Sequence, residues 1–432
     1  INDLFETANL VPGMVFSRAP DDGLGLTFRG LGTPARTQSF DQSVALFLDG
    51  MFLGKGRLYS LPIFDVQRIE YIKGTQSTLL GKNTSLGAIS IVSNLPSDGF
   101  STSVDLMTEL ENGAFGVNAN VNIPLLDNLK TRLSLHSVED NGWVDNIYKG
   151  VGAPGEEKVP LDKDTGFRAT IVYEHSENLE LTASYQYSES KRIGNAFQYI
   201  DVSNNIPSEV LDVLGEMQLD DQRTATCPEC PGSQSFHDTS ANMLNLTFKY
   251  GFDSGILTSA MSHIDYDLAF IDDFDFGNAF DEVTYSILNP GEINPYSTYF
   301  NRVEKYSQFS QELRFSSDSS QDLYYMVGLY YFESDWDSAE QQNWSTPNFP
   351  PPDQGALFNG SFTNIITQET KTLSLFIQST YKFSEKLHST LGIRYTDERK
   401  EVDFVRNQGA PVTLWNSVLN PPFSIAGIVS SL

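Results

Sequence analysis

The residues whose types could carry catalytic or metal chemistry are few, and the clearest are two cysteines. Cys227 and Cys230 enclose a Pro-Glu dipeptide, and a CxxC spacing can form a redox pair, half of a zinc site or a local disulfide. The sequence contains no second CxxC, and no alternation of strands and helices surrounds this one. In an oxidising compartment, we predict a disulfide that stiffens a long loop.

The other candidate residues lack the spacing that catalysis, metal binding or nucleotide binding requires. Between Gly74 and Gly81 lie six residues where a Walker A phosphate loop has four, and Asn83 replaces its Ser or Thr. No nucleophile–base pair is recognisable, so neither an enzyme nor a cofactor site is predicted. Five histidines without HExxH or carboxylate spacing are interpreted as strand or loop residues and not as metal ligands: His136, His175, His237, His263 and His388.

Charge and hydropathy narrow the class of protein further. The net charge is -28, from 28 basic and 56 acidic residues, and such a surface repels nucleic acid. The sequence has no apolar run as long as a transmembrane helix. With an ordinary hydrophobic fraction of 40%, any membrane signal must come from alternating strands.

The glycines and charges of residues 65–96 are positioned by two short predicted strands. Residues 66–72 alternate with period two, and Gly74 ends this strand because glycine adopts positive φ without strain. A polar turn leads to a second stop at Gly81, and Gly87 opens a mostly apolar strand. This unit is too small to bury a core of its own, so we expect a larger structure to enclose it.

This stretch resembles the end of the plug domain of TonB-dependent outer-membrane receptors, whose signature runs roughly RIE-V-xRGPQGxLYGxxAxGGAIxIxTxxP. Upstream, Arg29-Gly30 and Asp49-Gly50 resemble two further positions of the family. The sequence departs from the signature at Lys73, Thr75, Ser77, Leu80 and Leu86. It matches at Arg68, Ile69, Glu70, Gly74, Gln76, Leu79, Gly81, Asn83, Gly87, Ala88, Ile89, Ile91 and Pro96.

After residue 97 the pattern changes to long alternating strands, of which we expect eleven. Short turns alternate with long loops at about 139–166, 189–241, 267–305 and 333–371, which is typical of outer-membrane barrels. A soluble β-sandwich, which also alternates apolar and polar residues, is the alternative. We predict an all-β membrane protein, an antiparallel outer-membrane β-barrel that carries an N-terminal α+β plug domain.

The predicted domain bounds are 1–97 for the plug and 98–432 for the barrel. Family barrels have 22 strands, so the resemblance implies that about half of a barrel is present. The sequence starts without a Met, a basic region or an apolar leader, and we interpret it as a fragment.

Charges in the predicted plug are candidates for polar anchors to the barrel. Arg29, Arg68, Glu70 and Lys73 could pair with barrel residues that face the lumen, for which Glu312 is one candidate. Pairing within the plug, for instance of Arg68 with Glu70, is the equal alternative. Desolvation makes buried pairs only modestly stabilising, so such anchors would hold the plug and still allow it to be pulled.

Two tryptophans and an acidic segment are the candidates for ligand contact. Trp336 and Trp344 fall in the predicted loop at 333–371 and could stack on a ligand. Residues 267–305 combine carboxylates with aromatic residues but lack the fixed spacing of an EF-hand. We interpret this segment as a solvated acidic loop, with capture of a ligand or of Ca²⁺ as the alternative.

The resemblance implies active import across the bacterial outer membrane, driven by the TonB complex with ExbB and ExbD. A TonB box is expected before Ile1. An iron chelate such as a ferric siderophore is the expected ligand, with cobalamin, haem and oligosaccharides as alternatives. A passive porin and a structural or adhesive barrel are the rivals, and neither explains the stretch at 65–96.

Overall fold

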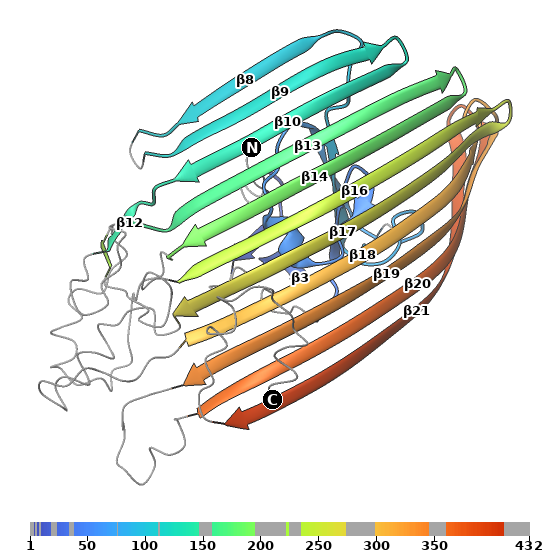
Figure 1. Cartoon of the computed structure of the whole chain (residues 1–432). Helices are drawn as coiled ribbons and strands as arrows, with labels where there is room; N and C mark the ends of the chain where they lie inside the picture. Colours follow the sequence, from blue (N-terminus) through green and yellow to red (C-terminus); the bar gives the residue numbers. More distant parts are fainter. Residues whose placement is uncertain are drawn as a thin grey trace, which may run out of the picture.

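One antiparallel sheet of eleven strands dominates the computed structural model (Figure 1). Each strand of this sheet, hereafter the wall, pairs with the strands next to it in chain order. The predicted number of strands and the all-β barrel architecture are confirmed. The described residues are 4, 7, 10–18, 24–33, 39–75, 77–110, 113–146, 158–194, 222–223, 235–273, 299–344 and 360–409.

The strands of the wall lengthen along the chain. The last two contain 25 and 23 residues, whereas a membrane crossing needs about 9–11. The wall consists of β8 (Ser101–Thr108), β9 (Phe115–Leu126), β10 (Leu129–Asp140), β13 (Leu161–Ser176), β14 (Leu179–Ile193), β16 (Phe236–Phe252), β17 (Gly255–Asp273), β18 (Tyr299–Ser317), β19 (Leu323–Trp344), β20 (Gly360–Ser384) and β21 (Leu387–Gly409).

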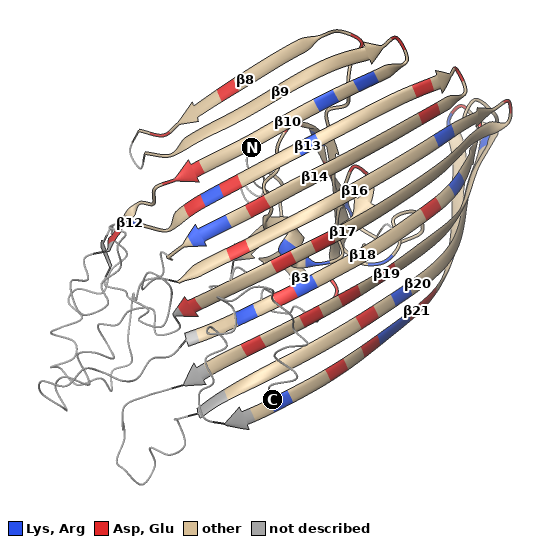
Figure 2. Ribbon diagram, viewed as in Figure 1, with Lys and Arg blue, Asp and Glu red and all other residues tan. Residues whose placement is uncertain are grey.

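The two faces of the wall differ because side chains alternate along each strand. On β10, for example, Ser134 and His136 are buried, while Leu135 between them is 55% exposed. Most charged residues of β10, β13 and β14 lie near the strand ends (Figure 2). The outward apolar set includes Leu135, Ile171, Leu181, Tyr185, Leu244, Leu313, Leu329, Leu375, Ile377, Leu391 and Ile393.

The N-terminal domain is built from two small sheets and one 3-10 helix, η1 (Gly56–Ser60). The first sheet contains β1 (Met14–Arg18), β2 (Leu24–Phe28) and β3 (Leu31–Thr33). The second has the order β5-β4-β7-β6 and confirms the two predicted strands, at 66–72 and from Gly87 onward. Its strands are β4 (Val44–Leu48), β5 (Met51–Phe52), β6 (Val66–Lys73) and β7 (Gly87–Ser93).

Two dipeptides noted in the sequence close tight hairpins in this domain. Arg29 and Gly30 link β2 to β3 with φ of 53° and 78°, and Asp49 and Gly50 link β4 to β5 with φ of 51° and 81°. Positive φ at both central residues is the requirement of a type I′ turn. These two dipeptides therefore serve to form the turns, through their backbone conformation.

The N-terminal domain lies against the buried, polar face of the wall. One hydrophobic cluster includes Leu46 and Ile89 from the domain together with Ile264, Tyr266 and Trp336 from the wall. After β7 the chain reaches β8 through residues 94–100. The boundary predicted near residue 97 falls in this connection.

The remaining described strands are short. β11 (Val144–Asn146), β12 (Lys158–Val159) and β15 (Gln222–Arg223) form a small sheet of their own. Among the described residues, no helix combines the length and the apolarity that crossing a membrane would require.

Candidate functional site between the N-terminal domain and the wall

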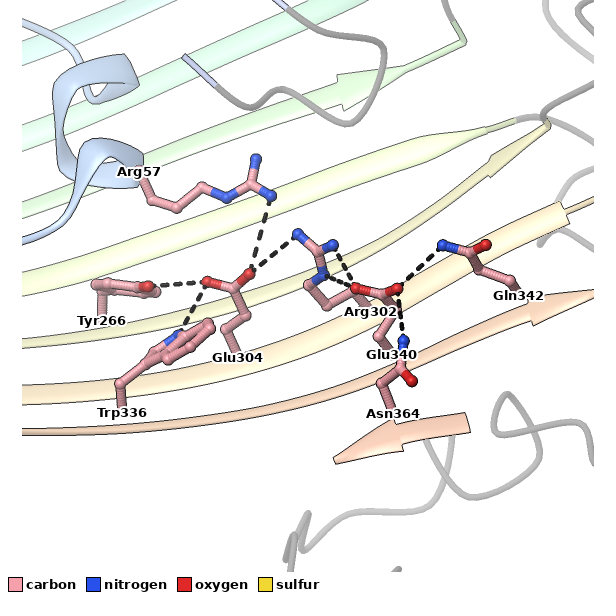
Figure 3. A network of polar contacts seen from close by, with 8 residues as sticks. All are labelled: Arg57, Tyr266, Arg302, Glu304, Trp336, Glu340, Gln342 and Asn364. Carbon is pink, nitrogen blue, oxygen red and sulfur yellow. Dashed lines mark hydrogen bonds and ion pairs between the residues drawn. The ribbon is translucent and has the colours of Figure 1, made fainter. Parts of the chain in front are cut away.

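A fully buried carboxylate on β18, that of Glu304, joins the N-terminal domain to the wall (Figure 3). One oxygen accepts hydrogen bonds from the Tyr266 hydroxyl at 2.9 Å and from Trp336 Nε1 at 3.3 Å. The other oxygen faces the guanidinium groups of Arg302 at 3.4 Å and Arg57 at 3.8 Å. Because Arg57 belongs to the N-terminal domain, both parts of the chain share this carboxylate.

The contacts continue along the wall beyond Glu304. Arg302 lies 2.5 Å from Glu340, and the second oxygen of that carboxylate accepts hydrogen bonds from Gln342 at 3.0 Å and Asn364 at 3.2 Å. We call the eight residues of Figure 3 the Glu304 network. It spans four neighbouring strands, β17 to β20 (Figure 3).

The helix η1 fixes the position of Arg57. Tyr59, in the same helix, is fully buried, and its hydroxyl both donates and accepts a hydrogen bond with the backbone of β4. This hydroxyl donates to the carbonyl of Val44 and accepts from the amide of Leu46, each at 3.1 Å. Through Tyr59, the guanidinium of Arg57 is therefore positioned by β4, a strand of the domain core.

The side chain of Lys55 contacts the wall beside that of Arg57. Its Nζ lies 3.8 Å from the ring centroid of Trp336, which attracts the charged form through the negative face of the indole. Burial lowers the pKa of Lys55 to about 7, although Glu304 and Asp41 act in the opposite direction. A buried amine in this range changes its charge close to neutral pH.

Asp65 forms a second anchor at the far side of the domain. Its carboxylate receives two hydrogen bonds from Arg132 on β10, at 2.6 Å and 2.7 Å, and one from Ser134 at 2.5 Å. Asn94 of the N-terminal domain donates a further one at 2.8 Å. Burial raises the pKa of Asp65, but these hydrogen bonds outweigh it and hold the pKa below its ordinary value.

The neighbouring Phe64 reinforces this anchor. Its carbonyl accepts a hydrogen bond from Arg168 at 3.1 Å, and its ring stacks on His136 with centroids 5.4 Å apart. A Cβ at Gly166 would lie 2.3 Å from the Phe64 ring. Glycine at this point of β13 is therefore required for the ring to reach the wall.

A cluster of opposite charges attaches the domain to the edge strand β21. Lys82 lies 3.0 Å from Glu398 and 3.5 Å from Asp41. Lys400 of β21 lies 3.1 Å from the other oxygen of Asp41. Here the domain cation Lys82 meets a wall carboxylate, that of Glu398, and the domain carboxylate of Asp41 meets the wall cation Lys400.

Backbone groups of the domain also bind the wall. The amide of Gln308 on β18 donates to the carbonyl of Phe52 at 2.7 Å and accepts from the backbone N–H of Gly54 at 3.0 Å. A Cβ at Gly54 would lie 2.3 Å from the Tyr306 hydroxyl. The Gln308 side chain therefore takes the place of a strand partner for the backbone groups at and after β5.

The structure does not bring the predicted anchors Arg68 and Glu70 to Glu312. Arg68 pairs with Glu70 at 2.6 Å, and both side chains are about half exposed. Glu312 pairs instead with Arg314 on its own strand, at 3.1 Å. Pairing within the domain, the alternative left open by the sequence, describes Arg68 and Glu70, and the pairing expected with Glu312 is corrected.

Arg29 and Lys73 are also placed away from the wall. Arg29 occupies its exposed hairpin turn, and Lys73 is the exposed last residue of β6. Neither forms an ion pair with another described residue.

Positive φ, which disfavours side chains, explains why the glycines of the loop between β6 and β7 belong to the motif: Gly74 (87°), Gly81 (79°) and Gly87 (150°).

The predicted ligand contacts have different outcomes. Trp336 is not in a loop: it lies on β19, buried in the Glu304 network. The loop expected from residue 333 is wrong because β19 continues to Trp344, whose side chain lies outside the described part. Cys227 and Cys230, with their predicted disulfide, also lie outside the described residues.

The histidines are dispersed over the wall. Among the described residues, no group of three or more His, Cys, Asp or Glu side chains could hold a metal ion. The ring nitrogens make separate contacts: His136 with Asn118, His175 with Tyr173 and His263 with Asp265.

The residues that carry the contact were largely missed in the sequence. Glu304 continues the inward register of Glu312 by four further steps of two residues, so a longer predicted strand would have included it. Asp65 was recognised only as the start of the motif. No sequence signal marked Lys55 or Arg57, because they lie at the short helix η1, in a segment whose partner Gln308 is 254 residues away from Gly54.

This arrangement can hold a domain firmly and still release it. Its polar anchors are ion pairs of both orientations and hydrogen bonds, spread over β10, β13, β18 and β21 beside the apolar cluster that the domain shares with the wall. Water and counterions can replace such contacts, whereas a large apolar interface offers no substitute partner.

Comparison with known families and structures agrees with the geometry. The TonB-dependent receptor plug domain matches residues 1–88. The TonB dependent receptor-like beta-barrel matches residues 231–421. No curated protein sequence matches the chain.

Solved receptors share the fold. The ferric yersiniabactin uptake receptor FyuA from Yersinia pestis is 14% identical, with a TM-score of 0.68 over 94% of this chain and 56% of that one. The outer-membrane ferripyoverdine receptor of Pseudomonas aeruginosa is 14% identical, with a TM-score of 0.67 over 94% and 51%. The alcaligin receptor FauA from Bordetella pertussis is 13% identical, with a TM-score of 0.57 over 95% and 55%.

The chain thus spans about half the length of the solved receptors that it matches. At these identities the likeness establishes the fold and not the ligand. Two matched domain models, an eleven-stranded wall and an inner N-terminal domain agree with one another. The chain belongs to the TonB-dependent receptors of the bacterial outer membrane, and it comprises the plug and part of the barrel.

Proposed function

We propose that the protein imports a scarce ligand across the outer membrane, driven by TonB. The observation that carries this proposal is the plug itself, seated on the polar face of the wall. A domain in this place obstructs the lumen, so passage of a solute requires the plug to move or rearrange. The polar and dispersed anchors, such as Asp65 with Arg132, make that movement feasible.

Energy for the movement has to come from outside the barrel, because no energy-yielding reaction is available at this membrane. We infer that TonB, with ExbB and ExbD, supplies it by pulling the plug. A passive porin needs no such domain, and an adhesive barrel has no use for breakable anchors.

For the ligand we propose an iron chelate of the siderophore class. The solved receptors of similar fold are named for ferric yersiniabactin, ferripyoverdine and alcaligin. Cobalamin, haem and oligosaccharides are the other classes to be tested.

The test separates binding from accumulation in cells that express the full-length receptor. Radiolabelled ferric yersiniabactin, ferric citrate and ferripyoverdine are offered to cells with and without TonB. We expect one chelate to bind in both strains and to accumulate only when TonB is present. Accumulation that is equal in the two strains would show passive entry and replace import by a porin function.

A plug variant sharpens this experiment. Asp65→Asn weakens one anchor without touching the long-loop end of the wall, so binding should persist while leakage of small solutes rises. The matched control is Arg68→Gln, since that side chain pairs within the plug and should change neither quantity.

A further inference from the structure

A cavity of about 410 Å³ lies between the plug and the wall. On the plug side it is lined by β4 to β7 and by Leu79 and Leu80 of the glycine loop, residues 74–86 between β6 and β7. On the wall side it is lined by β16 to β19 and by Arg394 of β21. Lys249 and Arg314 in its lining precede short turns, so the cavity lies toward the end of the barrel with short connections.

Three basic and three acidic side chains line this cavity, but three of the six are compensated elsewhere. Asp49 accepts two hydrogen bonds from Ser93 of the plug, at 2.7 Å and 2.8 Å, and its charge is opposed by the buried guanidinium of Arg168, which lies within electrostatic reach but outside the lining. Glu70 pairs with Arg68, which does not line the cavity. Likewise, the partner of the basic residue Lys249 is a carboxylate outside the lining, that of Glu180, at 2.8 Å.

The other three charges leave an excess of one positive charge. Glu312 lies 3.1 Å from Arg314 and within electrostatic reach of Arg394. A single carboxylate cannot neutralise two guanidinium groups. In addition, Arg314 Nε is buried without a hydrogen-bond partner among the described residues.

Arg394 points into the barrel and not toward the open edge of the sheet. Its guanidinium lies over the ring of Phe376, at 5.2 Å, and over that of Tyr330, at 5.7 Å, on the two preceding strands. It donates to the carbonyl of Thr78 in the glycine loop at 3.4 Å. Gly81 lets this loop approach, because a Cβ there would lie 2.8 Å from the guanidinium.

We infer that this cavity is an anion-accepting transit site on the exit side of the receptor, in which Arg314 and Arg394 bind and Glu312 competes with the cargo. The inference rests on the proposed import and names a chemical class for it: a small ligand, or part of a ligand, that carries carboxylate or other anionic groups. Guanidinium groups bind carboxylates with two parallel hydrogen bonds.

A local positive site has a physical purpose in this protein. The sequence as a whole has a net charge of -28, so its average field repels anions. An anionic cargo released from the outer binding surface would meet that field inside the lumen. Arg314 and Arg394, beside the glycine loop, offset this negative field at the place where the plug and the wall separate.

The experiment measures the local potential with charged thiol reagents. A single cysteine replaces Thr247, which lines the cavity, in detergent-solubilised full-length receptor carrying Cys227→Ser and Cys230→Ser. The rate with the anionic sulfonatoethyl methanethiosulfonate is divided by the rate with its cationic aminoethyl analogue. Removing one charge at this range should lower the ratio about threefold to tenfold in Arg394→Gln and in Arg314→Gln.

Two further variants protect this test from misfolding. Glu312→Gln removes a negative charge and should raise the ratio. General loosening of the fold would not lower the ratio in the arginine variants and raise it in Glu312→Gln. Arg68→Gln removes a charge outside the lining and should leave the ratio unchanged. Equal ratios in all variants, or an equal fall in Arg68→Gln, would overturn the inference.

Citrate, a small trianion, serves as the probe of binding. It should slow the modification of Thr247→Cys, and Arg394→Gln should raise the citrate concentration for half protection at least tenfold. Chloride at equal ionic strength should not protect; equal protection by chloride would reduce the site to charge screening. Neither measurement requires TonB, so TonB-independent accumulation would refute import without altering these results.

Discussion

At the scale of single residues, burial separates the charges that anchor the plug from those that do not. The Asp65–Arg132 pair is largely buried and bonded at both oxygens, whereas the Arg68–Glu70 pair is about half exposed. Exposed pairs contribute about 0–1 kcal/mol because water screens them. Breaking a buried pair costs more, because the remaining group loses its partner and is not fully rehydrated.

We therefore expect Asp65→Asn to destabilise the plug by about 2–4 kcal/mol and Arg68→Ala by less than about 1 kcal/mol. The free energy of unfolding of the plug can be measured by urea titration of the full-length receptor in detergent, with a fluorophore on the plug. Similar losses in the two variants would show that burial does not rank these anchors.

The Asp65 anchor also has a defined acid limit. The pKa of this carboxyl is lowered in the folded protein, so its stabilisation is present above the ordinary value of 3.8 and is lost as the pH falls through the folded value. Acid release of the plug should begin below that ordinary value, and Asp65→Asn should remove this part of the pH dependence.

Lys55 produces a pH dependence of the same sense, at a higher pH. Its folded pKa is about 7, and the unfolded value is about 10.4. Between these values the unfolded chain holds a proton that the folded chain has released. The free energy of unfolding should therefore rise with pH, by at most about 1.4 kcal/mol per pH unit from this group.

Lys55→Met should abolish this rise, because methionine keeps most of the side-chain volume against Trp336 but cannot titrate. The measurement is the difference in unfolding free energy between pH 7 and pH 9 for both proteins. An undiminished slope in Lys55→Met would assign the dependence to another group.

At the scale of elements, the loop between β6 and β7 depends on glycine for two separable reasons. Gly74 has φ of 87° with no atom within 4 Å of a Cβ, so only its conformation resists a side chain. Gly81 has φ of 79°, and a Cβ there would also meet the guanidinium of Arg394. Left-handed backbone costs an ordinary residue about 1–2 kcal/mol.

Gly74→Ala should therefore lose about that amount, and Gly81→Ala should lose more. Adding Arg394→Ala should remove the excess for Gly81→Ala and leave the effect of Gly74→Ala unchanged, as a double-mutant cycle measures. If Arg394→Ala shifts both alanine variants equally, the contact with Gly81 contributes nothing.

The elements also show what the sequence could reveal. Period-two alternation and glycine stops located the strands of the wall and of the second plug sheet, because one buried face fixes the register. The ends of long strands were missed: Trp336 and Glu304 lie on polar extensions where alternation fades. Contacts between the plug and the wall could not be predicted, since they join short segments without periodic patterning, such as that of Arg57, to distant strands.

At the scale of the whole molecule, the plug is held on several sides. The Asp65 anchor lies on β10, the Glu304 network on β17 to β20, and the Lys82 cluster on β21. Because the Asp65 anchor is far along the wall from the other two, losing it should loosen the plug without releasing it, and its energy should add to theirs. The Glu304 network and the Lys82 cluster should not be additive with each other, because Lys55 lies within electrostatic reach of both Glu304 and Asp41.

The wall itself ends in two strands with an unpaired edge, β8 and β21. Unpaired backbone groups in a bilayer each cost several kcal/mol, so a spanning sheet must close. Residues 1–432 expressed alone should therefore fail to form a closed barrel in lipid. We expect this polypeptide to migrate identically on a gel with and without heating, whereas the full-length receptor should show the heat-dependent shift of a closed barrel. A heat-dependent shift for residues 1–432 would mean that β8 and β21 pair, within one copy or between two, and the strand order of the wall would then be complete.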